Sequence, residues 1–254
     1  MFDLSSWLAP IAAAPIAGSF VGVLIRRLPQ GRSVGWARSE CESCKRTLSF
    51  TDLIPIASYV ALHGRCATCC APIGPFHFAI ELAAVAVAVS AVLIHRDFAW
   101  LWTTCLLGWT LLALSWIDAE HMRLPDALTL PLIAAGILAK ALLAPEQLAE
   151  SVLGAMSGYL SFRAVAVIYR VLRKRDGLGG GDAKLLSAAG AWVGWAALPD
   201  VVLLAAMCGL CFTGIKRATG TAGGQTAIIP FGPCLALALW TIYLFGSFIF
   251  DGLR

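Results

Sequence analysis

Two acidic segments contain carboxyl groups of the kind that can catalyse hydrolysis. The first begins at Asp118 and reads Asp-Ala-Glu-His-Met-Arg-Leu-Pro-Asp, and the second reads Gly179-Gly-Gly-Asp182-Ala-Lys184. Two carboxyl groups within a few ångströms of each other cannot both ionise easily, so one keeps a proton. The ionised partner can then act as a general base on water while the protonated one polarises a carbonyl group. This chemistry requires neither a nucleophilic side chain nor a catalytic metal.

Each of these carboxylates also has a structural interpretation. Asp126 follows Pro125 and precedes an apolar helix, so an N-cap role is at least as well supported as catalysis. Asp182 can cap a helix too, although a cap does not need three preceding glycines, which allow positive φ and close approach of a substrate. Asp118 ends a predicted helix, where the helix dipole disfavours an anion. Chemistry alone leaves catalysis and structure open for the Asp118/Asp182 pair.

Four of the nine cysteines have the spacing of metal ligands. They form two pairs, Cys41-Glu-Ser-Cys44 and Cys66-Ala-Thr-Cys69. Two such pairs can place four thiolates around one Zn²⁺ ion, and a loop of about fifty residues has too little core to fold without a staple. Disulfides are the alternative, but a cytoplasmic loop faces a reducing compartment. Cys70 is either a spare thiol or a competing ligand, and Cys208 and Cys211 are assigned to helix packing.

The composition places these groups in a membrane protein. The 254 residues are 59% hydrophobic and 13% charged, whereas a soluble domain has about 25% charged residues. The fold class predicted is therefore an all-α integral membrane protein with about eight transmembrane helices and a zinc-binding cytoplasmic loop. The predicted spans are residues 7–25, 79–94, 98–117, 128–144, 151–172, 183–198, 201–215 and 228–250, and the limits of the sixth and seventh are the least well defined.

The distribution of basic residues predicts the orientation. With the N-terminus outside, segments 26–78, 118–127, 170–184 and 216–227 face the cytoplasm and hold 15 of the 19 Lys and Arg residues. The cysteine loop and both aspartates then lie on one side. Because the basic residues occupy short loops between apolar runs, the net charge of +4 does not indicate a nucleic-acid partner. Three regions are predicted: a first helix at 1–25, the four-cysteine zinc loop at 26–78 and a polytopic core at 79–254.

An ordered set of motifs runs along nearly the whole chain. The set comprises Gly18-Ser19-Phe20 with Arg27-Leu28-Pro29, the two cysteine pairs flanking Ile54-Pro55 and Ser58-Tyr59, Ile117-Asp118-Ala119-Glu120 with Leu124-Pro125-Asp126, Gly179 to Asp182, and Pro230-Phe231-Gly232-Pro233. Each motif alone is weak evidence. In this order they resemble the type IV prepilin peptidases, which are aspartic proteases of the GxGD type.

The resemblance implies Asp118 and Asp182 as the catalytic pair, with Gly179, Gly181, Asp126 and Lys184 supporting the protease motif. It also implies cleavage of prepilins or pseudopilins after a glycine of a short basic leader, at the cytoplasmic face of the bacterial inner membrane. Full-length members then N-methylate the new N-terminal residue with S-adenosylmethionine. No separate nucleotide-binding fold is evident, and the candidates for that cofactor site are Gly64 and Glu81.

Two departures from the family pattern concern the methyl-transfer half. Gly22 stands where the family usually has Asn, and Phe76-His77-Phe78 stands where Arg-Tyr-Pro is common. A protease without methyltransferase activity is therefore one alternative. An alternative of another class is a non-enzymatic transporter or sensor that uses the carboxylates and thiolates as ion ligands. Arg163, inside the fifth predicted span, has no assigned role.

Overall fold

The computed structural model describes residues 4–35, 39–41, 43–49, 52, 54–95, 97–174, 179–219 and 230–247, with side chains from Leu8 onward. The described residues are helical, with no strand among them and two isolated β-bridges. The helices are α1 (Leu4–Arg27), η1 (Leu28–Gln30), α2 (Ala57–Ala61), α3 (Phe76–Ile94), α4 (Phe98–His121), α5 (Asp126–Leu143), η2 (Pro145–Gln147), α6 (Leu148–Arg173), α7 (Gly180–Val193), α8 (Leu198–Ala218) and α9 (Gly232–Phe245). The all-α prediction is confirmed.

A helix lies at each of the eight predicted spans, but the helices fall into two length classes. Six are long and apolar enough to cross a membrane, while α7 and α9 have only 14 residues each. This composition is that of a multi-pass membrane protein. The ends of the eighth predicted span, residues 228–229 and 248–250, lie outside the described residues.

The boundary between the sixth and seventh predicted spans differs from the expected one. The sequence suggested a break at Pro199-Asp200, but α7 ends at Val193 and α8 begins at Leu198. Gly194 ends α7 with φ +82°, a conformation that suits glycine. Pro199 lies in the first turn of α8, where its missing N–H has no helical partner in any case.

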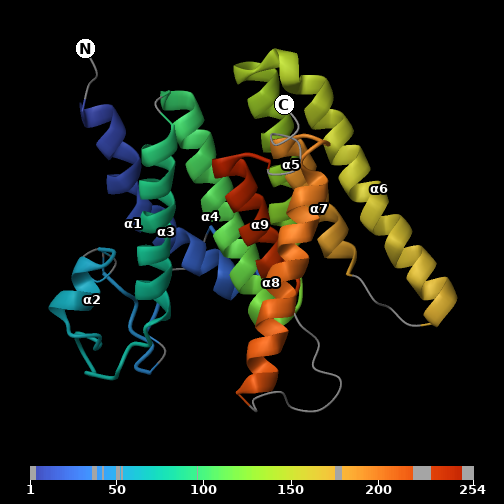
Figure 1. The fold of residues 1–254 in the computed structure, drawn as a ribbon. Helices are drawn as coiled ribbons and strands as arrows, with labels where there is room; N and C mark the ends of the chain where they lie inside the picture. Colours follow the sequence, from blue (N-terminus) through green and yellow to red (C-terminus); the bar gives the residue numbers. More distant parts are fainter. Residues whose placement is uncertain are drawn as a thin grey trace. The chain divides into compact units, whose positions relative to one another are not determined.

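The chain divides into two compact units, Met1–Ala113 and Leu114–Arg254. In the first unit α1 and α3 pack side by side (Figure 1). Gly18 permits this contact, because a Cβ atom there would lie 2.7 Å from the Glu81 Cα atom. The first part of α4 adds Leu101 and Cys105 to a small apolar core, and the Trp109 indole donates to the Ala84 carbonyl at 3.0 Å.

The second unit is built around α7. Nine of its fourteen residues are buried, and it contacts α5, α6, α8 and α9 (Figure 1). Against α6 the backbones nearly touch, since a Cβ atom on Gly190 would lie 2.0 Å from the Gly154 carbonyl oxygen. Ser187 Oγ donates to the Ala155 carbonyl across this contact. Because protein rather than lipid surrounds α7, this helix does not need the length of a membrane span.

Candidate active site and metal centre

Asp118 lies in the last turn of α4, within the second unit, and is 6% exposed. Its Oδ2 accepts a hydrogen bond of 2.9 Å from the backbone N–H of Gly232, the first residue of α9. The donor is one of the N–H groups that have no partner inside a helix, and the positive end of the α9 dipole points at the carboxylate. A Cβ atom on Gly232 would lie 2.6 Å from the same oxygen, so glycine is required there.

Asp182 lies in the first turn of α7. Its Oδ2 accepts a hydrogen bond of 3.2 Å from the N–H of Gly179, the N-cap residue. Asp182 therefore caps α7, as the structural alternative suggested. Its carboxylate also lies near enough to Asp118 for the charge of Asp118 to act on it. The structure thus brings together the two carboxylates that the sequence separates by 63 intervening residues.

Asp126 does not act as an N-cap. Pro125 holds the cap position of α5 without a side-chain hydrogen bond, and Asp126 is the first helical residue. Its carboxylate instead forms an ion pair with the Lys184 ammonium in α7. Gly181 lies against Leu124, where a Cβ atom would come within 2.8 Å of the Leu124 Cβ atom. Gly179, Gly181, Asp126 and Lys184 therefore all lie where the α4–α5 connection meets the start of α7.

The first cysteine pair lies in a tight hairpin in the first unit. The Cys41 N–H donates to the Arg46 carbonyl at 2.9 Å, and the Lys45 N–H donates to the Cys41 carbonyl at 2.9 Å. Lys45 has φ +57°, which closes the turn. The backbone N–H groups of Cys44 and Ser43 donate to the Cys41 sulfur and lower the pKa of that thiol. Such a turn favours the thiolate that a metal ion needs.

The second pair repeats this hairpin. The Cys66 N–H donates to the Ala71 carbonyl at 2.9 Å, and the Cys70 N–H donates to the Cys66 carbonyl at 3.0 Å. The N–H groups of Cys69 and Thr68 lower the pKa of Cys66 to about 6. Cys70, with φ +54°, occupies the place that Lys45 holds in the first hairpin. Cys70 is therefore the turn residue of its hairpin.

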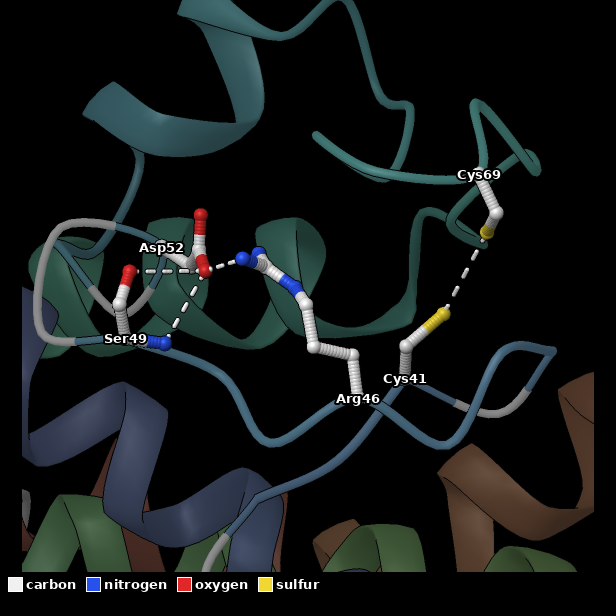
Figure 2. A network of polar contacts seen from close by, with 5 residues as sticks. All are labelled: Cys41, Arg46, Ser49, Asp52 and Cys69. Carbon is white, nitrogen blue, oxygen red and sulfur yellow. Dashed lines mark hydrogen bonds and ion pairs between the residues drawn. The ribbon is translucent and has the colours of Figure 1, made fainter.

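The two hairpins bring four sulfur atoms together. The ligand atoms of Cys41, Cys44, Cys66 and Cys69 all lie within 4.8 Å of one another. Figure 2 shows the sulfur atoms of Cys41 and Cys69 turned toward each other, 3.9 Å apart. A tetrahedral Zn–S distance of about 2.3 Å corresponds to sulfur atoms about 3.8 Å apart. This cluster can hold a metal ion, and among the described residues neither Cys70 nor the Cys208/Cys211 pair belongs to such a group.

A polar network extends from the first hairpin toward α2. The Arg46 guanidinium forms an ion pair with Asp52, and the same Asp52 oxygen accepts from the N–H and hydroxyl of Ser49 (Figure 2). Both Ser49 contacts and the Arg46 charge lower the pKa of Asp52. This network could not be predicted from the sequence, because Arg46 and Asp52 belong to no recognisable motif.

Glu81 of α3 binds the turn that begins α2. Its carboxylate is buried within α3 and accepts a hydrogen bond of 2.7 Å from the Ile56 N–H. Ile56 has φ +62° and ψ −54°, and the Ala57 N–H reaches back to the Pro55 carbonyl at 2.6 Å. This is a γ-turn of the rare positive-φ form, which is strained for a β-branched residue. Glu81 therefore fixes a strained turn that begins α2.

Gly64, the other cofactor-site candidate, also has a structural partner. It has φ +68°, and a Cβ atom there would lie 3.0 Å from the Tyr59 hydroxyl oxygen. The Tyr59 ring stacks on Phe78 of α3, with 4.9 Å between the ring centroids. Gly64 thus allows the second hairpin to approach Tyr59 of α2. Both candidates lie in the same part of the first unit, and the described contacts of each are structural.

The two departures from the family pattern are neighbours in space. A Cβ atom on Gly22 would lie 2.9 Å from the His77 Nδ1 atom, so the small residue in α1 makes room for the imidazole of α3. The Phe76 ring meets His77 edge-on and carries the Arg26 guanidinium on its face, 4.1 Å from the ring centroid.

Arg163, which has no role assigned from the sequence, is exposed on α6.

Two known protein families match most of the chain. The type IV leader peptidase family matches residues 105–214, and the bacterial peptidase A24 N-terminal domain matches residues 13–95. A prepilin leader peptidase/N-methyltransferase of Aeromonas hydrophila is 36% identical, with 91% of this chain and 88% of the relative covered. The chain belongs to the type IV leader peptidase family. The predicted family membership is confirmed.

Further members of the family show the same extent of similarity. The prepilin leader peptidase/N-methyltransferase of Pseudomonas aeruginosa is 35% identical over 94% of this chain and 90% of its own length. The protein of that name from Burkholderia pseudomallei is 35% identical over 91% and 83%. No solved structure matches the chain.

Proposed function

We propose that this leader peptidase cleaves the leader peptide from type IV prepilins or pseudopilins and then N-methylates the new N-terminal residue. Asp118 and Asp182 support this proposal, because both carboxylates belong to the unit that contains most of the leader peptidase match and the charge of Asp118 acts on Asp182. The family and the names of the relatives support both activities.

For cleavage, we infer a water-mediated mechanism. One carboxylate of the pair removes a proton from water while the protonated carboxyl group donates to the scissile carbonyl oxygen. The Gly232 N–H stabilises the ionised form of Asp118 by hydrogen bonding to it. The products are the leader, with a new carboxylate, and the pilin, with a new amino group. That amino group is the acceptor for methylation.

For methylation, S-adenosylmethionine as the methyl donor supplies an electrophilic methyl group when bound. Gly64 and Glu81 remain the candidate positions near which it binds, with Tyr59 and Phe78 fixing the shape of that region. The cysteine cluster is proposed to hold Zn²⁺ as a structural ion. Each hairpin is already fixed by its own backbone hydrogen bonds, so the role of the ion would be to join the two hairpins into one unit.

We place the protein in the bacterial inner membrane with the aspartates and the cysteine loop facing the cytoplasm. The basis is the asymmetry of its Lys and Arg residues, of which 15 out of 19 fall in the segments on that side. A short basic leader would then remain at the cytoplasmic face while the apolar part of the prepilin lies in the lipid.

Co-expression with a prepilin tests the protease. Wild type should convert the substrate to a faster-migrating band, while Asp118→Ala and Asp182→Ala, inserted in the membrane at normal levels, should leave it uncut. Cleavage by both variants would contradict the two-aspartate mechanism and favour an ion-binding role for these residues.

Mass spectrometry of the processed pilin tests the second activity. Methylation adds about 14 Da to the N-terminal residue by atomic mass, since one hydrogen is replaced by a methyl group and the proton is released from the amine. Processed pilin without this increment would favour a protease that lacks methyltransferase activity. The relatives' shared name favours the methylated product.

A further inference from the structure

The Asp126–Lys184 ion pair lies next to the two candidate catalytic carboxylates. It joins the first residue of α5 to the second turn of α7, and its side chains are 57% and 30% exposed. An ion pair this exposed adds little to the stability of a protein. If the ion pair contributes to function, it should therefore do so by fixing the positions of nearby groups.

Lys184 is not arranged to neutralise Asp182 directly. The two residues are two positions apart on α7, and residues with that spacing point to different sides of a helix. The Asp182 carboxylate turns back to the Gly179 N–H, within range of the Asp118 charge, while the Lys184 ammonium reaches Asp126 of α5. The ammonium group of Lys184 therefore links α7 to α5.

A force must hold the start of α7 near the end of α4. Asp118 and Asp182 repel each other when both are ionised, and this repulsion acts to separate the two segments. Two contacts between α7 and the residues that follow α4 oppose it. Gly181 packs on Leu124 in the α4–α5 connection without a side chain of its own, and Lys184 attracts Asp126 at the start of α5.

We propose that Asp126 and Lys184 form an electrostatic clamp that positions Asp182 opposite Asp118. This inference rests on the proposed protease function. Both members are positioning residues, since they act through the geometry of the aspartate pair and do not touch the reacting atoms. A displacement of about 1 Å at a catalytic group can cost about 100-fold in rate.

Charge reversal distinguishes a clamp from a local charge effect. Lys184→Asp and Asp126→Lys, each alone, place like charges opposite each other and should lower kcat for prepilin cleavage by about 10- to 100-fold, with KM changed less than threefold. The double variant Asp126→Lys/Lys184→Asp restores an attractive pair of reversed polarity. It should recover kcat to within about fivefold of wild type.

The double variant gives opposite results for the two explanations. If Lys184 acted through its positive charge on Asp182, an aspartate at position 184 would add a second negative charge near Asp182. The double variant would then be as impaired as Lys184→Asp alone, and that result would overturn the clamp. Recovery with an unchanged midpoint of thermal unfolding supports it.

Two further variants complete the design. Lys216→Asp reverses a charge in the last turn of α8 and serves as the matched control, expected to cleave at the wild-type rate. Asp118→Ala reports on the proposed function itself. If wild type and all charge variants fail to cleave, the protease assignment is wrong, whereas cleavage that depends on Asp118 but not on the charge pair rejects only the clamp.

Discussion

At Gly232, a hydrogen bond and the lack of a side chain serve the same carboxylate. The N–H of this residue donates to Asp118 Oδ2, and a methyl group in place of the Cα hydrogen would come within 2.6 Å of that oxygen. The sequence predicted Asp118 from its chemistry and Gly232 only as part of a family motif. The contact between them could not be predicted, because 113 residues separate the two positions.

Gly232→Ala is therefore expected to displace the Asp118 carboxylate and to lower kcat for prepilin cleavage by at least about 10-fold. The matched control is Gly214→Ala in α8, where an added Cβ atom meets nothing within 4 Å. Wild-type cleavage by Gly232→Ala would show that Asp118 does not need this contact. Gel mobility of the prepilin measures both variants.

The strained turn at Ile56 leads to a second prediction for a single residue. Glu81→Ala removes the acceptor of the Ile56 N–H, a partly buried donor, and leaving such a donor unpaired costs up to about 1–3 kcal/mol. We expect the cysteine loop to be cut faster by trypsin at Arg32, Lys45 and Arg65, while cleavage of prepilin continues. Glu146→Ala, at an exposed position in η2, is the control and should not change the trypsin pattern.

At the scale of helices, the α6–α7 contact depends on small residues. Gly154 and Gly158 lie one turn apart on α6, and each allows the backbone of α7 to approach. This Gly-x-x-x-Gly spacing is a sequence signal for close helix packing from which the contact could have been predicted. The short length of α7 could not be read from hydropathy, because a helix enclosed by protein and a helix in lipid have the same apolar composition.

Gly190→Ala should destabilise this contact strongly. The new Cβ atom would lie 2.0 Å from the Gly154 carbonyl oxygen, and a backbone atom cannot rotate away as a side chain can. We expect a loss of more than about 3 kcal/mol in the free energy of unfolding, measured by titration with denaturing detergent. Gly209→Ala, in open space on α8, should change it by less than about 1 kcal/mol. Equal stability of the two variants would mean that α6 and α7 are not packed as described.

At the scale of the whole molecule, the metal content provides a direct test of the cysteine cluster. Purified wild type should contain one zinc ion per chain, and Cys69→Ser should contain much less, because a structural zinc site needs four ligands. Cys70→Ser is the matched control. Its thiol belongs to the turn of the hairpin, so elemental analysis should still find one zinc ion per chain. Equal loss from both variants would make Cys70 a ligand.

Sequence and structure agree best where a pattern is local. The CxxC spacing predicted the four-sulfur cluster, and apolar runs predicted helices at all eight positions. The sequence did not reveal that Lys45 and Cys70 occupy equivalent turn positions in the two hairpins. The equivalence lies in their positive φ angles, which neither residue type predicts. The ion pair of Asp126 was not predicted either, because its partner Lys184 lies 58 positions away in the chain.

The short helices α7 and α9 have a consequence for hydration. Fourteen residues extend about 21 Å, whereas the hydrocarbon layer is about 30 Å thick. The first turns of these two helices hold Asp182 and the Gly232 N–H that binds Asp118. Because neither helix reaches across the layer, their first turns can lie below the level of the lipid headgroups without any break in a helix. Peptide hydrolysis consumes one water molecule per bond, so catalysis by this aspartate pair requires water at the depth of these two first turns.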